Sequence, residues 1–119
     1  MSDVEVDAPR LGQPPREFDT YQFILLKWPE SRPTVTKEEA DRLQSLHLGH
    51  LATMRDRGLL LASGPLSEQA DERLRGICIY RVESLDRARE LAESDPAVVA
   101  GRLEIDAMIW STPKGALQP

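Results

Sequence analysis

The stretch QSLHLGHLATMRDRGLLLASGP, residues 44–65, joins two kinds of hydrophobic pattern in one short segment. Its first half repeats leucine and methionine at spacings of three and four, which is typical of a helix with one apolar face. Its second half is a short apolar run closed by Gly64 and Pro65, which indicates a strand that ends in a turn. The two histidines of the chain, His47 and His50, lie among the leucines of the helical half.

The helix predicted from this pattern begins upstream of the quoted stretch and ends inside it. Thr36 is a favoured N-cap residue, and Glu39 stands three positions later, which is the spacing of a capping box. Gly58 stands where a residue in the left-handed conformation would end the helix. The sequence therefore predicts a helix over residues 36–58, followed by a strand over residues 59–65.

The remaining elements complete a familiar order of strands and helices. Apolar runs, alternation and helical spacing predict, in chain order, a strand over 20–28, a strand over 75–82, a helix over 83–94, a short turn of helix over 95–102 and a strand over 103–110. The order β-α-β-β-α-β is that of the ferredoxin-like arrangement. The predicted fold class is therefore α+β, with a four-stranded antiparallel sheet and two helices on one of its faces.

The second face of this sheet has no predicted cover. The strand over residues 20–28 is almost continuously apolar, and the last strand carries Met108 and Trp110 on the side opposite Ile105 and Ala107. Two helices cover only one face, and an uncovered apolar face is either an interface or an aggregation hazard. We therefore expect a homodimer in which two sheets pack against each other.

The domain organisation follows from length and composition. A chain of 119 residues fits a single domain, which we place at residues 18–113. Residues 1–17 contain three prolines, a glycine and many charges, and predict a disordered or loosely attached arm. Residues 114–119 are expected to form a short C-terminal tail.

Charge and cysteine content limit the classes of partner and location. The net charge is −5, and the positive side chains are scattered among acidic ones along the sequence, which argues against nucleic acid or an anionic membrane as partner. No apolar run is close to the length of about 18 residues that a membrane-spanning helix needs. Without a signal-peptide pattern at the N-terminus, we expect a cytoplasmic protein. The single cysteine, Cys78, lies in an apolar strand and is expected to be a buried hydrophobic residue.

The two histidines differ in their expected position on the helix. At about 100° per residue, His47 lies in the middle of the apolar face and His50 at its edge. His47 therefore has two possible interpretations, a core histidine satisfied by a hydrogen bond or a catalytic acid–base group. A metal shared by both histidines would need further ligands, and no HExxH motif or Cys/His cluster is present, so no metal site is predicted.

Four short motifs together point to a known family. They are His47-Leu48 on the predicted helix, Gly64-Pro65 after the second strand, and Asp95-Pro96 with Ala100-Gly101 before the last strand. Their order and spacing over residues 20–112 resemble those of the YciI-like (YCII-related) family. The resemblance implies the dimeric α/β-barrel form of the ferredoxin-like fold, shared with muconolactone isomerase and small monooxygenases.

The same resemblance implies a site. It places a His–Asp pair in a cleft, which here means His47 and Asp95 as catalytic residues, and one relative is a dehydrochlorinase acting on a chlorinated hydroxyquinol. Asp95 also has a local interpretation as the N-cap before Pro96. As a partner of His47 it would instead fix the tautomer of the imidazole. Candidate substrate-binding residues around the same cleft are Ser63, Gly64, Pro65, Tyr21 and His50, each of which also has a structural interpretation.

These observations lead to two hypotheses for function. The first is a small enzyme without a cofactor that uses a His–Asp acid–base pair on a small organic substrate, as an isomerase, lyase or dehydrohalogenase. The second is a non-catalytic dimeric module that binds a ligand or assists another protein. A third, a cofactor-free monooxygenase, is weakened because the chain has only two each of Trp, Tyr and Phe for an aromatic pocket. The sequence leaves open whether the protein is an enzyme.

Overall fold

The computed structural model of the chain describes residues 17–117. Nearly all of the predicted N-terminal arm and the last two residues of the predicted tail lie outside the described residues. The elements in chain order are β1 (Phe18–Lys27), α2 (Lys37–Asp56), β2 (Leu60–Pro65), β3 (Leu74–Tyr80), α3 (Leu85–Glu93), α4 (Pro96–Val99) and β4 (Glu104–Pro113).

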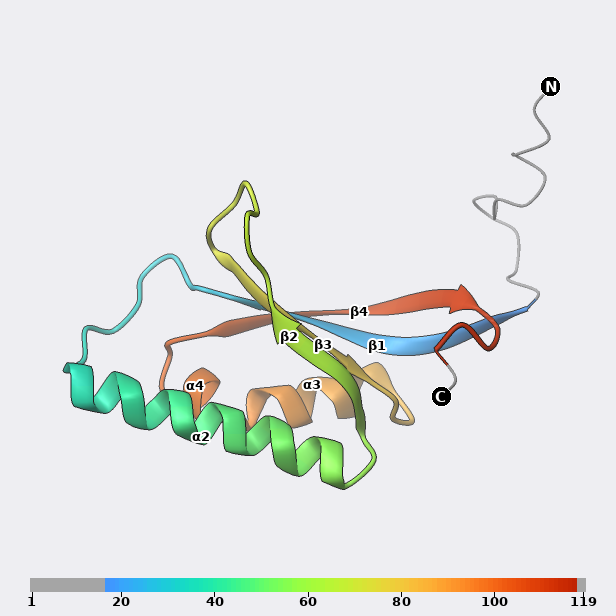
Figure 1. Cartoon of the computed structure of the whole chain (residues 1–119), viewed down its shortest axis with the longest axis horizontal. Coiled ribbons are helices and arrows are strands. Elements are labelled where there is room, and N and C mark those ends of the chain that lie inside the picture. The colour runs from blue at the N-terminus through green and yellow to red at the C-terminus, as the bar shows by residue number, and fades with distance from the viewer. Residues whose placement is uncertain (1–16, 118–119) are drawn as a thin grey trace.

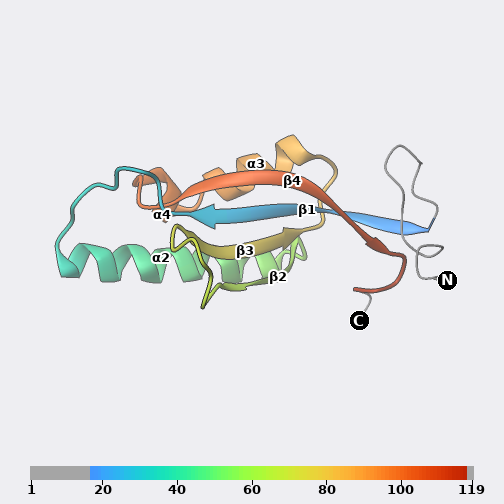
Figure 2. The same cartoon turned by 90° about the horizontal axis from the view of Figure 1, so that it is seen from above.

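The strands form one antiparallel sheet in the order β2-β3-β1-β4, which Figure 2 shows from above. The helices α2, α3 and α4 all lie on the same side of this sheet (Figure 1). The prediction of an α+β, ferredoxin-like fold is therefore confirmed. The strand pairing runs further than predicted, from Phe18 opposite Pro113 to Lys27 opposite Glu104. The pattern missed these outer ends because the residues there are largely polar.

The start and end of α2 follow the predicted signals in part. The Thr36 hydroxyl accepts a hydrogen bond from the Glu39 N–H at 3.1 Å, as an N-cap does. The reciprocal half of the capping box is wrong, because the Glu39 carboxylate instead accepts two hydrogen bonds from Arg42 at 2.8 Å. Gly58 follows the helix with a φ of 76°, in the left-handed region that the prediction required.

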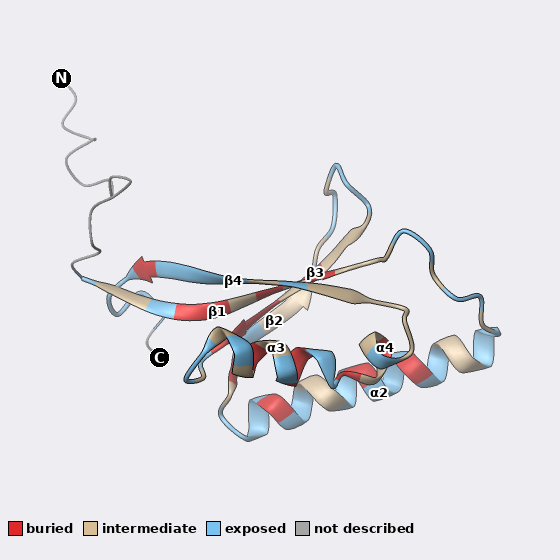
Figure 3. Cartoon of the chain, turned by 180° about the vertical axis from the view of Figure 1, so that it is seen from behind, coloured by how far each residue is buried: buried red, intermediate tan, exposed pale blue. Residues whose placement is uncertain are grey.

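The hydrophobic core lies between the sheet and the helices. Ile24 of β1 and Ala88 of α3 are completely buried there, and Met54 of α2 packs against the same cluster. Buried residues recur as separate bands along α2, as expected for one apolar face (Figure 3). Cys78 is 2% exposed, and burial raises the pKa of its thiol to about 12, so the thiol is protonated at neutral pH. The prediction of a buried, unreactive cysteine agrees with this environment.

The opposite face of the sheet carries apolar side chains that no described helix covers. Phe23 pairs with Met108, and Tyr21 pairs with Trp110, with their ring centroids 6.2 Å apart. Because side chains alternate along a strand, these residues lie on the face opposite Ile24. The Met108 and Trp110 side chains remain 38% and 37% exposed.

Candidate active site

Asp95 lies at the junction of α3 and α4 and is 2% exposed. Its Oδ1 accepts a hydrogen bond from the Ala97 N–H at 2.9 Å, which caps α4. Its Oδ2 lies 2.5 Å from Nδ1 of His47. Asp95 therefore both caps α4 and contacts His47, since each carboxylate oxygen has a different partner.

His47 lies in the middle of α2, on its buried face. With Nδ1 engaged by Asp95, the second ring nitrogen, Nε2, has no hydrogen-bond partner among residues 17–117. A carboxylate acceptor favours the tautomer that carries its proton on Nδ1, which leaves the lone pair on Nε2. His47 also lines a cavity, and of its two ring nitrogens Nε2 is the one not engaged by Asp95.

The cavity has a volume of about 540 Å³, within the range of sites for small molecules. It lies between α2 and the ends of β1, β2 and β3. Of the predicted binding residues, Ser63, Gly64 and Pro65 of β2 line it. A Cβ atom at Gly76 of β3 would stand 2.9 Å from the Gly64 carbonyl oxygen, so only glycine permits this close approach of the two strands in the cavity wall.

His50 and Tyr21 do not line this cavity. His50 is half-buried, and its Nε2 is buried with no hydrogen-bond partner in the described part of the chain. Burial lowers the pKa of His50, assisted by the nearby His47, while the negative charge of Asp95 opposes the effect. Tyr21 lies against Trp110 on the opposite face of the sheet. We therefore leave both residues out of the proposed ligand contacts.

Four arginines line the cavity and were not foreseen. The positive charges are scattered along the sequence, yet the fold brings four arginines to the lining of one cavity: Arg32, Arg55, Arg75 and Arg102. No acidic side chain lines the cavity within residues 17–117. These arginines come from different segments and follow no motif, so no signal in the sequence would have grouped them.

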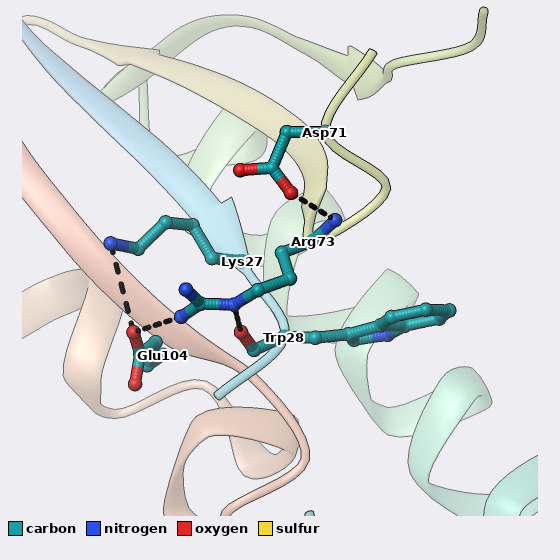
Figure 4. A network of polar contacts seen from close by, with 5 residues as sticks. All are labelled: Lys27, Trp28, Asp71, Arg73 and Glu104. Carbon is teal, nitrogen blue, oxygen red and sulfur yellow. Dashed lines mark hydrogen bonds and ion pairs between the residues drawn. The ribbon is translucent and has the colours of Figure 1, made fainter. Parts of the chain in front are cut away.

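Trp28, a further lining residue that was not predicted, supports two of these arginines. The guanidinium carbons of Arg32 and Arg75 lie 4.3 and 4.0 Å from the centroid of its ring. The backbone of Trp28 exchanges two hydrogen bonds with Arg73, whose guanidinium also binds Glu104 (Figure 4). These hydrogen bonds anchor the backbone at Trp28, and its indole carries the two stacked arginines.

The described residues contain no group of three or more His, Cys, Asp or Glu side chains arranged to hold a metal ion. Within the same residues, no helix is long and apolar enough to cross a membrane.

Comparison with known proteins places the chain in a family. No curated protein matches the sequence. Among solved structures, the chain is similar to 5-chloro-2-hydroxyhydroquinone dehydrochlorinase from Burkholderia phenoliruptrix AC1100 in complex with 2,5-dihydroxybenzoquinone. The TM-score is 0.47 and the identity 20%, covering 75% of this chain and 90% of that one. The model of the YCII-related domain matches residues 24–109. The chain therefore belongs to the YCII-related family.

Proposed function

We propose that this protein is a small enzyme that works without a cofactor and uses His47 as a general acid–base. The observation that carries the proposal is the contact of His47 Nδ1 with Asp95 Oδ2 at 2.5 Å, on a histidine that lines a cavity of about 540 Å³. A histidine that is held in one tautomer and lines a cavity of this size is suited to proton transfer.

In the proposed mechanism, Nε2 of His47 takes a proton from a carbon next to a carbonyl group or from a phenol hydroxyl. The carboxylate of Asp95 stabilises the imidazolium that forms, so Asp95 acts as a positioning residue. The electron pair left on the substrate either accepts the proton back at another carbon, which is isomerisation, or expels a leaving group such as a halide, which is elimination. Both outcomes balance without an oxidant or a reductant.

The test of this proposal measures proton exchange and does not require the natural substrate. A panel of cyclic ketones, 1,3-diketones and hydroxyquinols is incubated with the protein in D₂O, and loss of the acidic C–H signals is followed by proton NMR. His47→Gln keeps a polar side chain beside Asp95 but removes the base, and we expect exchange to fall at least about 100-fold.

The control for this experiment is His50→Gln, which removes the other histidine of α2 and leaves the cavity lining intact. Circular dichroism verifies that both variants fold. Exchange that is equally fast in His47→Gln and in the wild type would refute the catalytic role. Binding of panel members without any exchange would favour the alternative, a non-catalytic dimeric ligand-binding or accessory module.

We also propose that the protein is a homodimer built from residues 18–113. The uncovered apolar face of the sheet supports this, because Met108 and Trp110 are more than one-third exposed on it although they are large and hydrophobic. Packing this face against the same face of a second copy removes both side chains from water. The strand pairing from Phe18 to Pro113 supports the domain bounds.

A further inference from the structure

Three guanidinium groups approach one another in the wall of the cavity. Arg32 comes from the loop between β1 and α2, Arg75 from β3, and Arg102 from the segment before β4. The three are close enough for their charges to act on each other: burial lowers the pKa of Arg32, and the positive charges of Arg102 and Arg75 lower it further. The fold therefore brings three like charges near one another.

No carboxylate offsets this charge within residues 17–117. Elsewhere on the described surface, ion pairs with acidic side chains are formed by Arg42, Arg73, Arg87 and Arg89. In the cavity, Arg75 and Arg102 each donate one hydrogen bond to a backbone carbonyl oxygen, which orients the group but leaves its charge uncompensated. The Nε of Arg32 is buried and has no hydrogen-bond partner among the described residues.

Stacking on Trp28 and hydrogen bonds to the backbone orient these guanidinium groups. The Trp28 N–H donates to the Arg73 carbonyl at 2.8 Å, and the Trp28 carbonyl accepts from Arg73 Nε at 2.9 Å. The indole points away from this network (Figure 4) and carries Arg32 and Arg75. The Arg102 guanidinium is tied to the Pro33 carbonyl at 2.8 Å. Such preorganisation lowers the entropy cost of binding a partner of opposite charge.

We propose that the ligand of this cavity is a small organic oxyanion, whose anionic group binds to Arg32, Arg75 and Arg102. An oxyanion supplies a negative charge to balance the three guanidinium groups. Its oxygens accept hydrogen bonds from their free N–H groups in the planar geometry that arginine favours. This proposal deepens the proposed function, on which it rests, because His47 lines the same cavity and would act on another part of the same molecule.

The experiment is an NMR titration that detects binding without turnover. The probes are 4-hydroxybenzoate and the neutral 4-hydroxybenzamide, which match in shape and differ in charge, together with phenyl phosphate. The indole N–H signal of Trp28 reports on the cavity, and that of Trp110 on the opposite face of the sheet is the internal control. The variant Trp110→Phe assigns the two signals.

We expect both anions to shift the Trp28 signal in a saturable way and the amide to bind at least about tenfold more weakly. The tighter of the two anions identifies the source of the oxyanion as a carboxylate or a phosphate. Arg32→Gln and Arg75→Gln should each weaken anion binding about tenfold, since each removes charge-assisted hydrogen bonds. The control Arg81→Gln, at an exposed arginine outside the cavity, should bind as the wild type does.

Several outcomes separate this inference from the proposed function. Equal binding of amide and benzoate, or anion binding that survives Arg32→Gln and Arg75→Gln unchanged, would overturn the oxyanion site. Anion binding that persists in His47→Gln, without proton exchange in the wild type, would support the oxyanion site while the enzyme proposal fails. Exchange of neutral compounds together with no anion binding would leave the enzyme proposal standing and refute the oxyanion site.

Discussion

The two faces of the sheet are built from the same alternating strands, yet they meet different surroundings. On the face towards the helices, Ile24 is fully buried, and the buried carboxylate of Asp95 is paired with His47 and Ala97. On the other face, Met108 and Trp110 stay partly exposed. A strand that is apolar almost throughout, as β1 is, gives the sheet two apolar faces, whereas the helices of one chain cover only one of them.

The largest effect is expected when Asp95 is removed from the covered side of the sheet. Asp95→Ala leaves the Ala97 N–H and the His47 ring without their acceptor in a buried place, and we expect a loss of stability of about 3 kcal/mol. Asp95→Asn retains a cap and should lose about 1 kcal/mol. Urea denaturation measures both changes in the free energy of unfolding.

The matched control is Asp86→Ala, which removes an exposed carboxylate of α3 that pairs with Arg89. Exposed ion pairs contribute little, so this variant should lose less than about 1 kcal/mol. If Asp95→Ala proved as stable as Asp86→Ala, Asp95 would have no structural role on the covered face.

A smaller effect is expected on the uncovered face. Trp110→Lys places a charge in the proposed interface and should weaken self-association at least about tenfold without unfolding the chain. Ile109→Lys, one position along β4 with the side chain on the opposite side of the strand, is the control and should leave association unchanged. Sedimentation velocity over a range of concentrations measures the effect, and a wild-type protein that is monomeric throughout would disprove the interface.

The smallest effect concerns His50, which is half-buried on the covered side. Since burial lowers its pKa in the folded protein, only the unfolded chain binds a proton when the pH first falls below about 6.5, the usual histidine value. Its contribution to stability is therefore intact above that pH and declines as the pH falls towards the lowered pKa. His50→Gln should show a shallower loss of stability over this window, measured by urea denaturation at a series of pH values. An unchanged slope would contradict the direction of the shift.

Local sequence patterns predicted much of the fold. The apolar spacing and the Thr36 and Gly58 signals predicted α2 to within two residues at each end. The strands were predicted from apolar runs. Their polar outer ends were missed because these ends are held in the sheet by pairing with a neighbouring strand, which leaves no local pattern in the sequence. The second half of the capping box failed because Glu39 has a better partner in Arg42 one turn further along the helix.

The candidate site was predictable only where local and family signals met. His47 was singled out by its place on the apolar face together with the family resemblance, and Asp95 by the resemblance alone, since its position before Pro96 indicated only a helix cap. The arginines of the cavity could not be predicted, because Arg32 and Arg102 lie 70 positions apart and neither belongs to a periodic pattern. The antiparallel register of β1 and β3, with Lys27 opposite Leu74, is what carries Trp28 to the side of Arg73 and Arg75.

Local sequence patterns specify the elements, their order and the inward face of α2, because hydrophobic periodicity and capping depend on residues a few positions apart. The contact of Asp95 with His47 across 48 positions, and the arginines from separate segments that line one cavity, arise from the packing of the whole chain. Those arrangements depend on strand register and on where loops return the chain, and the free energy that selects them comes from packing the whole sheet against its helices.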